Sequence, residues 1–407
     1  MGNPPSLLPA KRGGAFRFFR LVSVGLALFS CLHPSHAQED DRLDFKYMYY
    51  GDKNGVWNHT PAFTFLKALS FRWKFQWNQE FDAVSGASRR LGMRNVGRQG
   101  DHDLVLDGIT GASKREIRHS EQAGISFADK GRQGSASFYY SDESDYTSYS
   151  PSVSGSWDFN QRNTTLGGAL SVFFDNLHPQ GAFSGLGGDR TLISGTLSLT
   201  QIVSPTTLVS MTANSIRSSG ALGHPYNPVV LADGALLIES LPAGKTSYAL
   251  AGQIIQGYAW GDRRGSVHLD ARYYRDTWYL SSQTGEVQVY QYYSDQGYLR
   301  LRSRLYRQTP AAFAKEGYAG NEVYRTADIR YFGFSSLTLG LKWASVFPDG
   351  WAEKAWLPDR WDIAYDHGMR DTRGDEGGPG PFTHYQLFPK SEFYAQGVFM
   401  LGIGFDL

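Results

Sequence analysis

The stretch Phe71-Arg72-Trp73-Lys74-Phe75-Gln76-Trp77-Asn78-Gln79-Glu80-Phe81 alternates two kinds of side chain. Its aromatic residues share one face of an extended chain, and its basic and amide residues share the other. A period of two predicts a β-strand. A soluble sandwich would bury the aromatic face against a second sheet. A membrane barrel would turn that face toward lipid and point Arg72 and Lys74 into a watery lumen.

The composition separates these classes only in part. The chain has 407 residues and a formal net charge of +1, without the basic excess typical of proteins that bind nucleic acid. Hydrophobic residues make up 41%, the mean hydropathy is −0.38, and no long apolar run follows residue 40, which argues against a helical membrane protein. A membrane barrel can be this polar, because each strand turns half of its residues toward water.

The first 37 residues have the pattern of a cleavable signal peptide. Basic residues from Lys11 to Arg20 precede an apolar run over Leu21–Leu32, and Ser35-His36-Ala37 fits a cleavage site. The only cysteine, Cys31, lies inside this segment. We therefore expect an exported chain without disulfides, cysteine-based catalysis or cysteine-bound zinc.

From Lys114 onward, extended segments come in pairs joined by very short turns, with longer loops between the pairs. Many evenly spaced strands without helical periodicity predict a closed all-β sheet, and the alternation of short turns with long loops is typical of outer-membrane barrels, whose short turns are periplasmic. The predicted pairs are 116–129 with 134–141, 151–159 with 164–174, 191–202 with 207–216, 247–260 with 265–274, 286–293 with 298–306, and 323–331 with 337–346.

Strand direction sets the expected number of strands. Residues 71–81 must run up from the periplasm and residues 393–407 must run down, which predicts a single-chain antiparallel transmembrane β-barrel of about 14 strands over residues 70–407. The alternative is about 16, if 361–365 and 384–388 also cross or if 43–50 is included. Residues 38–69 are expected to form a periplasmic N-terminal segment that leads into the barrel.

The ends of the predicted barrel follow from the same reasoning. Strand 71–81 should then close the barrel against 393–407, unless Leu43–Tyr50 pairs with the last strand instead. The alternating apolar residues that end at Leu407 resemble the signal that outer-membrane assembly machinery reads, although Phe is the usual last residue.

Several motifs together resemble a bacterial family known as domain of unknown function 3570. They are Asp82-Ala-Val-Ser-Gly-Ala-Ser88, Ser141-Asp-Glu-Ser-Asp-Tyr146, Thr200-Gln-Ile-Val-Ser-Pro205, His224-Pro-Tyr-Asn-Pro-Val-Val230 and Ala271-Arg-Tyr-Tyr-Arg-Asp-Thr-Trp278. The resemblance spans most of the chain after the signal peptide and implies an exported outer-membrane barrel. The family has no established activity, so the resemblance assigns no catalytic residue.

Charged residues on the predicted inner faces are the main candidates for a functional site. An arginine on the lipid face would cost about 2–4 kcal/mol at the membrane midplane, which favours the inward assignment. These residues either form ion pairs that stiffen the wall or make a basic constriction that favours anionic solutes. They are Arg72, Lys74, His268, Asp270, Arg272, Glu286, Arg300, Arg302, Arg304, Asp328 and Arg330.

Two heptads of similar sequence bracket a polar loop. They are either tight turns, in which Asp and Ser cap backbone groups, or the borders of a loop that folds inward around a ligand. Their motif residues are Asp82, Ser85, Gly86, Ser88, Asp107, Thr110, Gly111 and Ser113. The acidic residues Asp142, Glu143 and Asp145 are a weak candidate for a metal site, and we expect no cofactor.

The sequence favours a passive, porin-like channel in the outer membrane. The alternative is a non-conducting structural barrel that serves as a scaffold in an envelope complex, and a barrel lipase or protease is less favoured. His119 and Ser120 are adjacent and would point to opposite faces of a strand, and no Gly-x-Ser-x-Gly motif stands at a strand-to-helix turn, so we expect no enzyme. The expected partners are membrane lipid, the assembly machinery and small anionic solutes.

Overall fold

The structure is a computed structural model, and it describes residues 41–52, 57–84, 92–93, 104–105, 116–226, 229–231, 235–315, 317–347, 357–371 and 394–406. The predicted signal peptide and residues 384–388 lie outside these ranges. None of the helices in the described ranges is long and apolar enough to cross a membrane.

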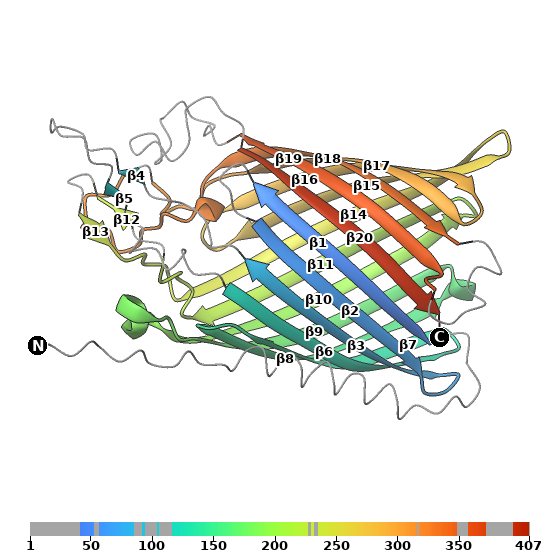
Figure 1. Cartoon of the computed structure of the whole chain (residues 1–407), viewed down its shortest axis with the longest axis horizontal. Coiled ribbons are helices and arrows are strands. Elements are labelled where there is room, and N and C mark those ends of the chain that lie inside the picture. The colour runs from blue at the N-terminus through green and yellow to red at the C-terminus, as the bar shows by residue number, and fades with distance from the viewer. Residues whose placement is uncertain are drawn as a thin grey trace, which may run out of the picture. The chain divides into compact units, whose positions relative to one another are not determined.

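Within the described residues, sixteen antiparallel strands form one closed barrel (Figure 1). Strands that follow one another along the chain are also neighbours in the sheet, so the connections are simple up-and-down hairpins. In barrel order the strands are β1 (Arg42–Asp52), β2 (Trp57–Ala68), β3 (Trp73–Val84), β6 (Glu116–Asp129), β7 (Arg132–Asp142), β8 (Tyr146–Phe159), β9 (Thr164–Leu177), β10 (Gly188–Ser204), β11 (Thr207–Gly220), β14 (Gly244–Trp260), β15 (Arg263–Asp276), β16 (Ser281–Ser294), β17 (Gly297–Gln308), β18 (Phe334–Val346), β19 (Arg360–Asp371) and β20 (Tyr394–Asp406).

Short elements occupy the connections. The pairs β4 (Gly92–Met93) with β5 (Leu104–Val105) and β12 (Val229–Val230) with β13 (Leu236–Leu237) form two-stranded ladders outside the barrel sheet. The 3₁₀ turns are η2 (Asn160–Arg162), η3 (Gly181–Leu186) and η4 (Ile329–Tyr331). We call the end with the short β6–β7, β8–β9 and β10–β11 turns the turn end, and the opposite end the loop end.

The predicted closed antiparallel barrel is confirmed, with sixteen strands in place of fourteen. The expected N-terminal segment over 38–69 instead contains β1 and β2, and β1 closes the barrel by pairing with β20 from Arg42↔Asp406 to Asp52↔Gln396. The aromatic stretch 71–81 therefore contributes to the third strand, β3, and does not meet the last strand. Only residues 53–56 separate β1 from β2.

The predicted strand over 323–331 was wrong. These residues belong to the connection between β17 and β18, where Ala327 and Tyr331 pack against buried apolar clusters of the loop end. The alternation of polar and apolar residues over 323–331 therefore reflects packing within a loop, because a loop that folds on itself also has a buried side and an exposed side. Strand β19 crosses instead, as the alternative count allowed for 361–365.

The outer surface of the barrel carries large exposed apolar side chains in three levels. Aromatic residues stand near the turn end, at Trp73, Trp157, Trp260 and Trp343, and near the loop end, at Tyr49, Tyr140 and Tyr149. Aliphatic residues such as Val153, Leu170, Leu197 and Leu301 lie between these two levels. An apolar band flanked by aromatic girdles is the surface of a transmembrane β-barrel.

Candidate functional site in the barrel lumen

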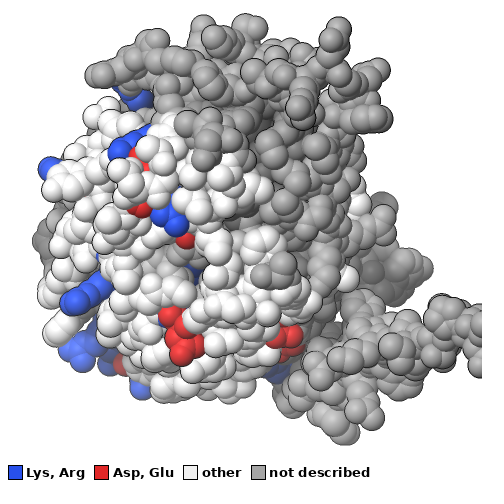
Figure 2. Space-filling model, turned by 90° about the vertical axis from the view of Figure 1, so that its left-hand side faces the viewer, with Lys and Arg blue, Asp and Glu red and all other residues white. Residues whose placement is uncertain are grey.

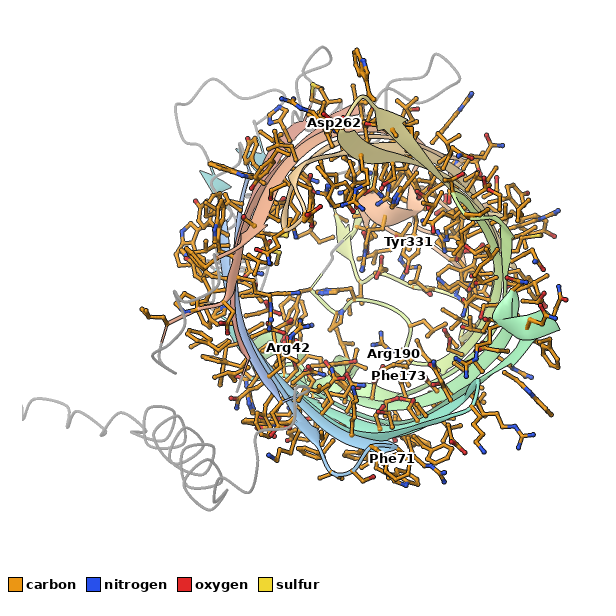
Figure 3. The ribbon with its side chains drawn as sticks, turned by 90° about the vertical axis from the view of Figure 1, so that its right-hand side faces the viewer. Arg42, Phe71, Phe173, Arg190, Asp262 and Tyr331 are labelled. Atoms are coloured by element: carbon orange, nitrogen blue, oxygen red, sulfur yellow. The ribbon has the colours of Figure 1, made fainter. Side chains whose placement is uncertain are left out.

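The lumen is lined by the side chains that alternate with the outward apolar residues. Viewed from the turn end, Arg42, Phe173, Arg190 and Tyr331 lie inside the ring of strands, whereas Phe71 lies on its outer side (Figure 3). Phe71 belongs to the turn before β3 and is 80% exposed. Because successive side chains of a strand point to opposite faces, each charged residue of the barrel can be assigned to the lumen or to the outer surface.

Arg302 is the centre of the largest ion-pair group in the described lumen. Its guanidinium donates to Glu286 on β16 at 2.9 Å and to Asp366 on β19, also at 2.9 Å. Arg304 lies 4.0 Å from the same Glu286 carboxylate. Arg302 and both carboxylates are largely buried, because the neighbouring side chains of the wall cover them.

Glycine on the intervening strand allows these long-range bridges. Arg302 on β17 reaches Asp366 by crossing β18 at Gly340, where an added Cβ would lie 2.0 Å from the Asp366 Oδ1 atom. In the same way, Arg360 on β19 reaches Asp44 on β1 at 2.9 Å across Gly404 of β20. An added Cβ at Gly404 would lie 2.4 Å from the Arg360 Nε atom. The missing side chains leave the space through which each pair makes contact.

A second group of ion pairs links β3 and β6, and a hydrogen bond extends it to β2. Arg118 bridges Asp82 and Glu80, and the Glu80 contact measures 3.2 Å. Asp82 also accepts a hydrogen bond of 2.5 Å from Thr60. The sequence placed Asp82 in a turn motif, whereas the structure makes it a lumen residue of β3. The remaining motif residues, Ser85, Gly86, Ser88, Asp107, Thr110, Gly111 and Ser113, lie outside the described residues.

The other predicted residues of β15 and β17 face the lumen with fewer ionic contacts. His268 stacks on Tyr290 with a centroid separation of 4.5 Å. Asp270 accepts a hydrogen bond of 2.6 Å from Gln253, and Arg272 lies over the ring of Tyr274.

Arg300 is different, because no described carboxylate lies within 4 Å of its guanidinium, whereas Arg302 pairs with two carboxylates. Strand β17 thus presents one largely uncompensated cation to the lumen.

The remaining predicted lumen residues lie at the two ends. Lys74 is on the inner face of β3, whereas Arg72 belongs to the preceding turn and pairs with Asp129 at 3.4 Å. Asp328 and Arg330 lie in the β17–β18 connection and pair with each other, with a distance of 2.8 Å from Arg330 Nε to the carboxylate. At the loop end, basic and acidic side chains are interspersed (Figure 2).

The part of the lumen wall formed by β7 to β10 differs from the charged part around β17, and the sequence-based predictions did not include it. The inner faces of β7 to β10 carry mainly serine and threonine, a set we call the hydroxyl wall. The hydroxyl groups of Ser135 on β7 and Ser154 on β8 share a hydrogen bond of 2.7 Å, and Gln122 of the adjacent β6 donates to Ser137 at 3.1 Å. The signal was present as alternating serine over Ser148-Tyr-Ser-Pro-Ser-Val-Ser-Gly-Ser156. The wall comprises Ser135, Ser137, Ser141, Ser148, Ser150, Ser152, Ser154, Ser156, Ser171, Ser194, Thr196, Ser198 and Thr200.

Two long connections pack together at the loop end, and we call them the loop pair: residues 221–243 and 309–333. Ser240 and Arg325 form a β-bridge between them, and Phe313 packs with Trp278 in a buried apolar cluster. Tyr274, an inward residue of β15, packs against the same cluster, which ties the loop pair to the inner wall.

A buried carboxylate lies where the two connections meet. Glu239 is 8% exposed and accepts hydrogen bonds from the Thr326 hydroxyl and from the His224 backbone N–H at 2.6 Å. Burial raises the pKa of Glu239 to about 7, and these hydrogen bonds only partly oppose the shift. Burial also lowers the pKa of His224 and raises the pKa of Tyr331 to about 12. The loop pair therefore contains an acid that titrates near neutral pH.

The acidic candidates at the β7–β8 turn make ordinary turn contacts. Asp142 accepts a hydrogen bond of 3.2 Å from Thr147, the Glu143 N–H donates to the Tyr146 carbonyl, and the Asp145 carbonyl accepts from His178. In the part of the chain that the structure describes, no group of three or more His, Cys, Asp or Glu side chains is arranged to hold a metal ion.

The fold and the lining define a transmembrane β-barrel with a polar lumen. The chain belongs to the family described as "Protein of unknown function (DUF3570)", whose model matches residues 21–392. The family resemblance predicted from the motifs is thereby confirmed. No curated protein has a sequence that matches this chain.

Solved structures share the fold at very low sequence identity. A "Bacterial polysaccharide outer membrane secretin" has a TM-score of 0.51 and 9% identity, covering 91% of this chain and 100% of that one. "CdiB from Acinetobacter baumannii" has a TM-score of 0.51 and 8% identity, covering 90% of this chain and 60% of that one. "Pseudomonas aeruginosa OccK2 (OpdF)" has a TM-score of 0.40 and 9% identity, covering 90% of this chain and 98% of that one. At these identities the likeness concerns the fold alone.

Proposed function

We propose that this protein is a passive channel of the outer membrane, with a weakly basic lumen that admits small hydrophilic solutes and favours anions. The observation that carries the proposal is the division of the barrel into an apolar outer face and an inner face of charged, hydroxyl and amide groups. A wall of this kind keeps water and hydrated solutes inside the barrel. In this proposal a signal peptide directs export, and the assembly machinery inserts the chain by recognising its C-terminal strand.

Anion preference rests on Arg300 and on the residues around it. Carboxylates compensate Arg302 and Arg118, so these two contribute less to the field that a passing solute meets. Arg300 has no such partner among the described residues, and Arg272 contacts an aromatic ring. Uncompensated cations on a pore wall raise the local concentration of anions.

Planar-bilayer recordings in a potassium chloride gradient test the proposal. We expect single-channel conductance with preference for chloride, and Arg300→Gln should reduce that preference because it removes one uncompensated charge. Arg275→Gln on the outer face of β15 is the matched control and should leave selectivity unchanged. Absence of conductance in both the purified, folded wild type and Phe313→Ala would refute the channel function, and unchanged selectivity in Arg300→Gln would refute the role of Arg300.

A second candidate is a non-conducting structural barrel. The loop pair favours it, because Tyr274 of the inner wall packs against the apolar cluster of these connections. Phe313→Ala should loosen this packing. Conductance that is absent in both the wild type and Phe313→Ala would favour the structural barrel, whereas conductance that appears only in the variant would indicate a closed channel.

Catalysis has less support. His119 stacks on Phe81 of the outer face, with a centroid separation of 4.7 Å, and strand parity turns the adjacent Ser120 inward. The two side chains therefore do not form a nucleophile and base pair. Lipase and protease assays on the purified barrel should give no activity.

A further inference from the structure

The two halves of the lumen differ in chemistry and face each other. In the barrel order, β17 stands eight strands from β7 in either direction, so Arg300 is opposite the hydroxyl wall. The inner faces of β7 to β11 carry charge only near their ends, at Asp158 near the turn end and at Arg190 and Asp175 near the loop end. Arg300 lies three residues from Gly297, the turn-end residue of β17, so a solute that crosses the lumen passes this cation on one wall and uncharged hydroxyl groups on the opposite wall.

Both sides retain unused hydrogen-bonding capacity. Arg300 is partly exposed and has no described carboxylate within 4 Å of its guanidinium. On the hydroxyl wall, Ser154 is exposed and Ser137 and Ser152 are partly exposed. Elsewhere on the wall, each serine hydroxyl has one donor and two acceptor sites, and a bond such as Ser135 to Ser154 uses only part of them.

Resting on the proposed channel function, we propose that the preferred solutes are small polyhydroxylated carboxylates, the chemical class of the sugar acids. The carboxylate would pair with Arg300 as a charge-assisted contact, for which a planar guanidinium is well suited. The hydroxyl groups of the solute would exchange hydrogen bonds with Ser137, Ser152 and Ser154 while it passes. An aliphatic carboxylate of equal carbon number would meet the same cation but would leave these serines without solute partners.

Gluconate and hexanoate separate the two contributions, because both have six carbons and one carboxylate. Reversal potentials at pH 8, measured against chloride with wild-type protein, should show higher permeability for gluconate than for hexanoate. Replacing Ser137, Ser152 and Ser154 together by alanine should lower the gluconate-to-hexanoate ratio about threefold, since each lost hydrogen bond contributes modestly. The preference of this variant for anions over cations should stay the same.

Arg300→Gln should have the opposite signature, with both carboxylates losing permeability by the same factor. Ser215→Ala, on the outer face of β11, is the matched control and should change neither ratio. Protein-free bilayers measure any leak of hexanoic acid through lipid.

The outcomes distinguish the inference from the function on which it rests. Absence of potassium chloride conductance would refute the channel itself. Normal conductance with equal or lower permeability for gluconate would overturn the solute class while leaving the channel intact. A gluconate preference that survives the triple serine replacement would also overturn it, because the hydroxyl wall would then have no part in selection.

Discussion

Arg302 on β17 and Asp366 on β19 form an ion pair of 2.9 Å across the strand between them, and Gly340 of β18 makes this contact sterically possible. Adjacent strands are already joined by backbone hydrogen bonds, so a bridge that skips a strand adds a different restraint. It joins side chains of β17 and β19 directly, across β18. The Arg360–Asp44 pair across Gly404 repeats the arrangement beside the closure of β20 on β1.

Gly340→Ala should destabilise the barrel, because the new methyl group would lie 2.0 Å from the Asp366 Oδ1 atom and push the carboxylate away from Arg302. We expect a loss of about 1–3 kcal/mol from the overpacking together with the weakened pair. Urea titration of the folded barrel in detergent, followed by gel mobility, measures it. Gly285→Ala is the control, since an added Cβ there meets no atom within 4 Å, and equal losses in both variants would contradict the steric explanation.

Arg302→Gln and Asp366→Asn should not be additive. Each single replacement leaves a largely buried partner without its counter-charge, so the double variant should lose less stability than the sum of the two single variants. Contacting residues typically couple by about 0.5–3 kcal/mol. A double-mutant cycle in the same urea assay measures this coupling. A coupling energy of zero would show that the bridge adds nothing to the stability of the wall.

The alternation in the sequence located most strands and assigned their faces, because a period of two fixes the direction of every side chain once one is known. The arginines of β17 could thus be placed opposite Leu299 and Leu301 from the sequence alone. The partners of those arginines could not, since Asp366 lies two strands away and its contact depends on Gly340. Local alternation also failed at 323–331, where an inner and an outer face arise from the packing of Phe313 and Tyr331 in a loop.

Leu301→Arg should impair insertion of the barrel in a way that Ser137→Arg does not. Leu301 is 61% exposed on the outer face, where arginine at mid-membrane depth costs about 2–4 kcal/mol. Ser137 faces the lumen, where water can solvate the new charge. Spontaneous folding into lipid vesicles, followed by protease protection, compares the two variants. Equal folding yields would argue that Leu301 does not face lipid.

The loop pair should pack less tightly as the pH rises, because it buries Glu239. The pKa of this carboxyl is raised from 4.5 to about 7, so the packed form holds a proton that the opened form releases. Its contribution to packing is fully present below about pH 4.5 and is lost as the pH rises through about 7, an effect on the order of 3 kcal/mol. Among its charged neighbours, Asp328 raises the pKa of Glu239 and Arg330 lowers it, while burial lowers the pKa of the adjacent His224.

Hydrogen exchange of peptides from 222–231 and 311–331, compared at equal pH between variants, tests this linkage. Wild-type exchange, corrected for the intrinsic rate, should increase between pH 5 and pH 8. The Glu239→Gln variant should stay protected at both pH values, because the glutamine amide does not ionise in this range. Glu322→Gln is the control within the same connection. The backbone N–H groups of Ala319 and Gly320 lower the pKa of that carboxylate, so it stays ionised over this range and its replacement should preserve the pH dependence. If protection of the wild type does not change with pH, ionisation of Glu239 does not weaken the packing of the loop pair, and the prediction is wrong.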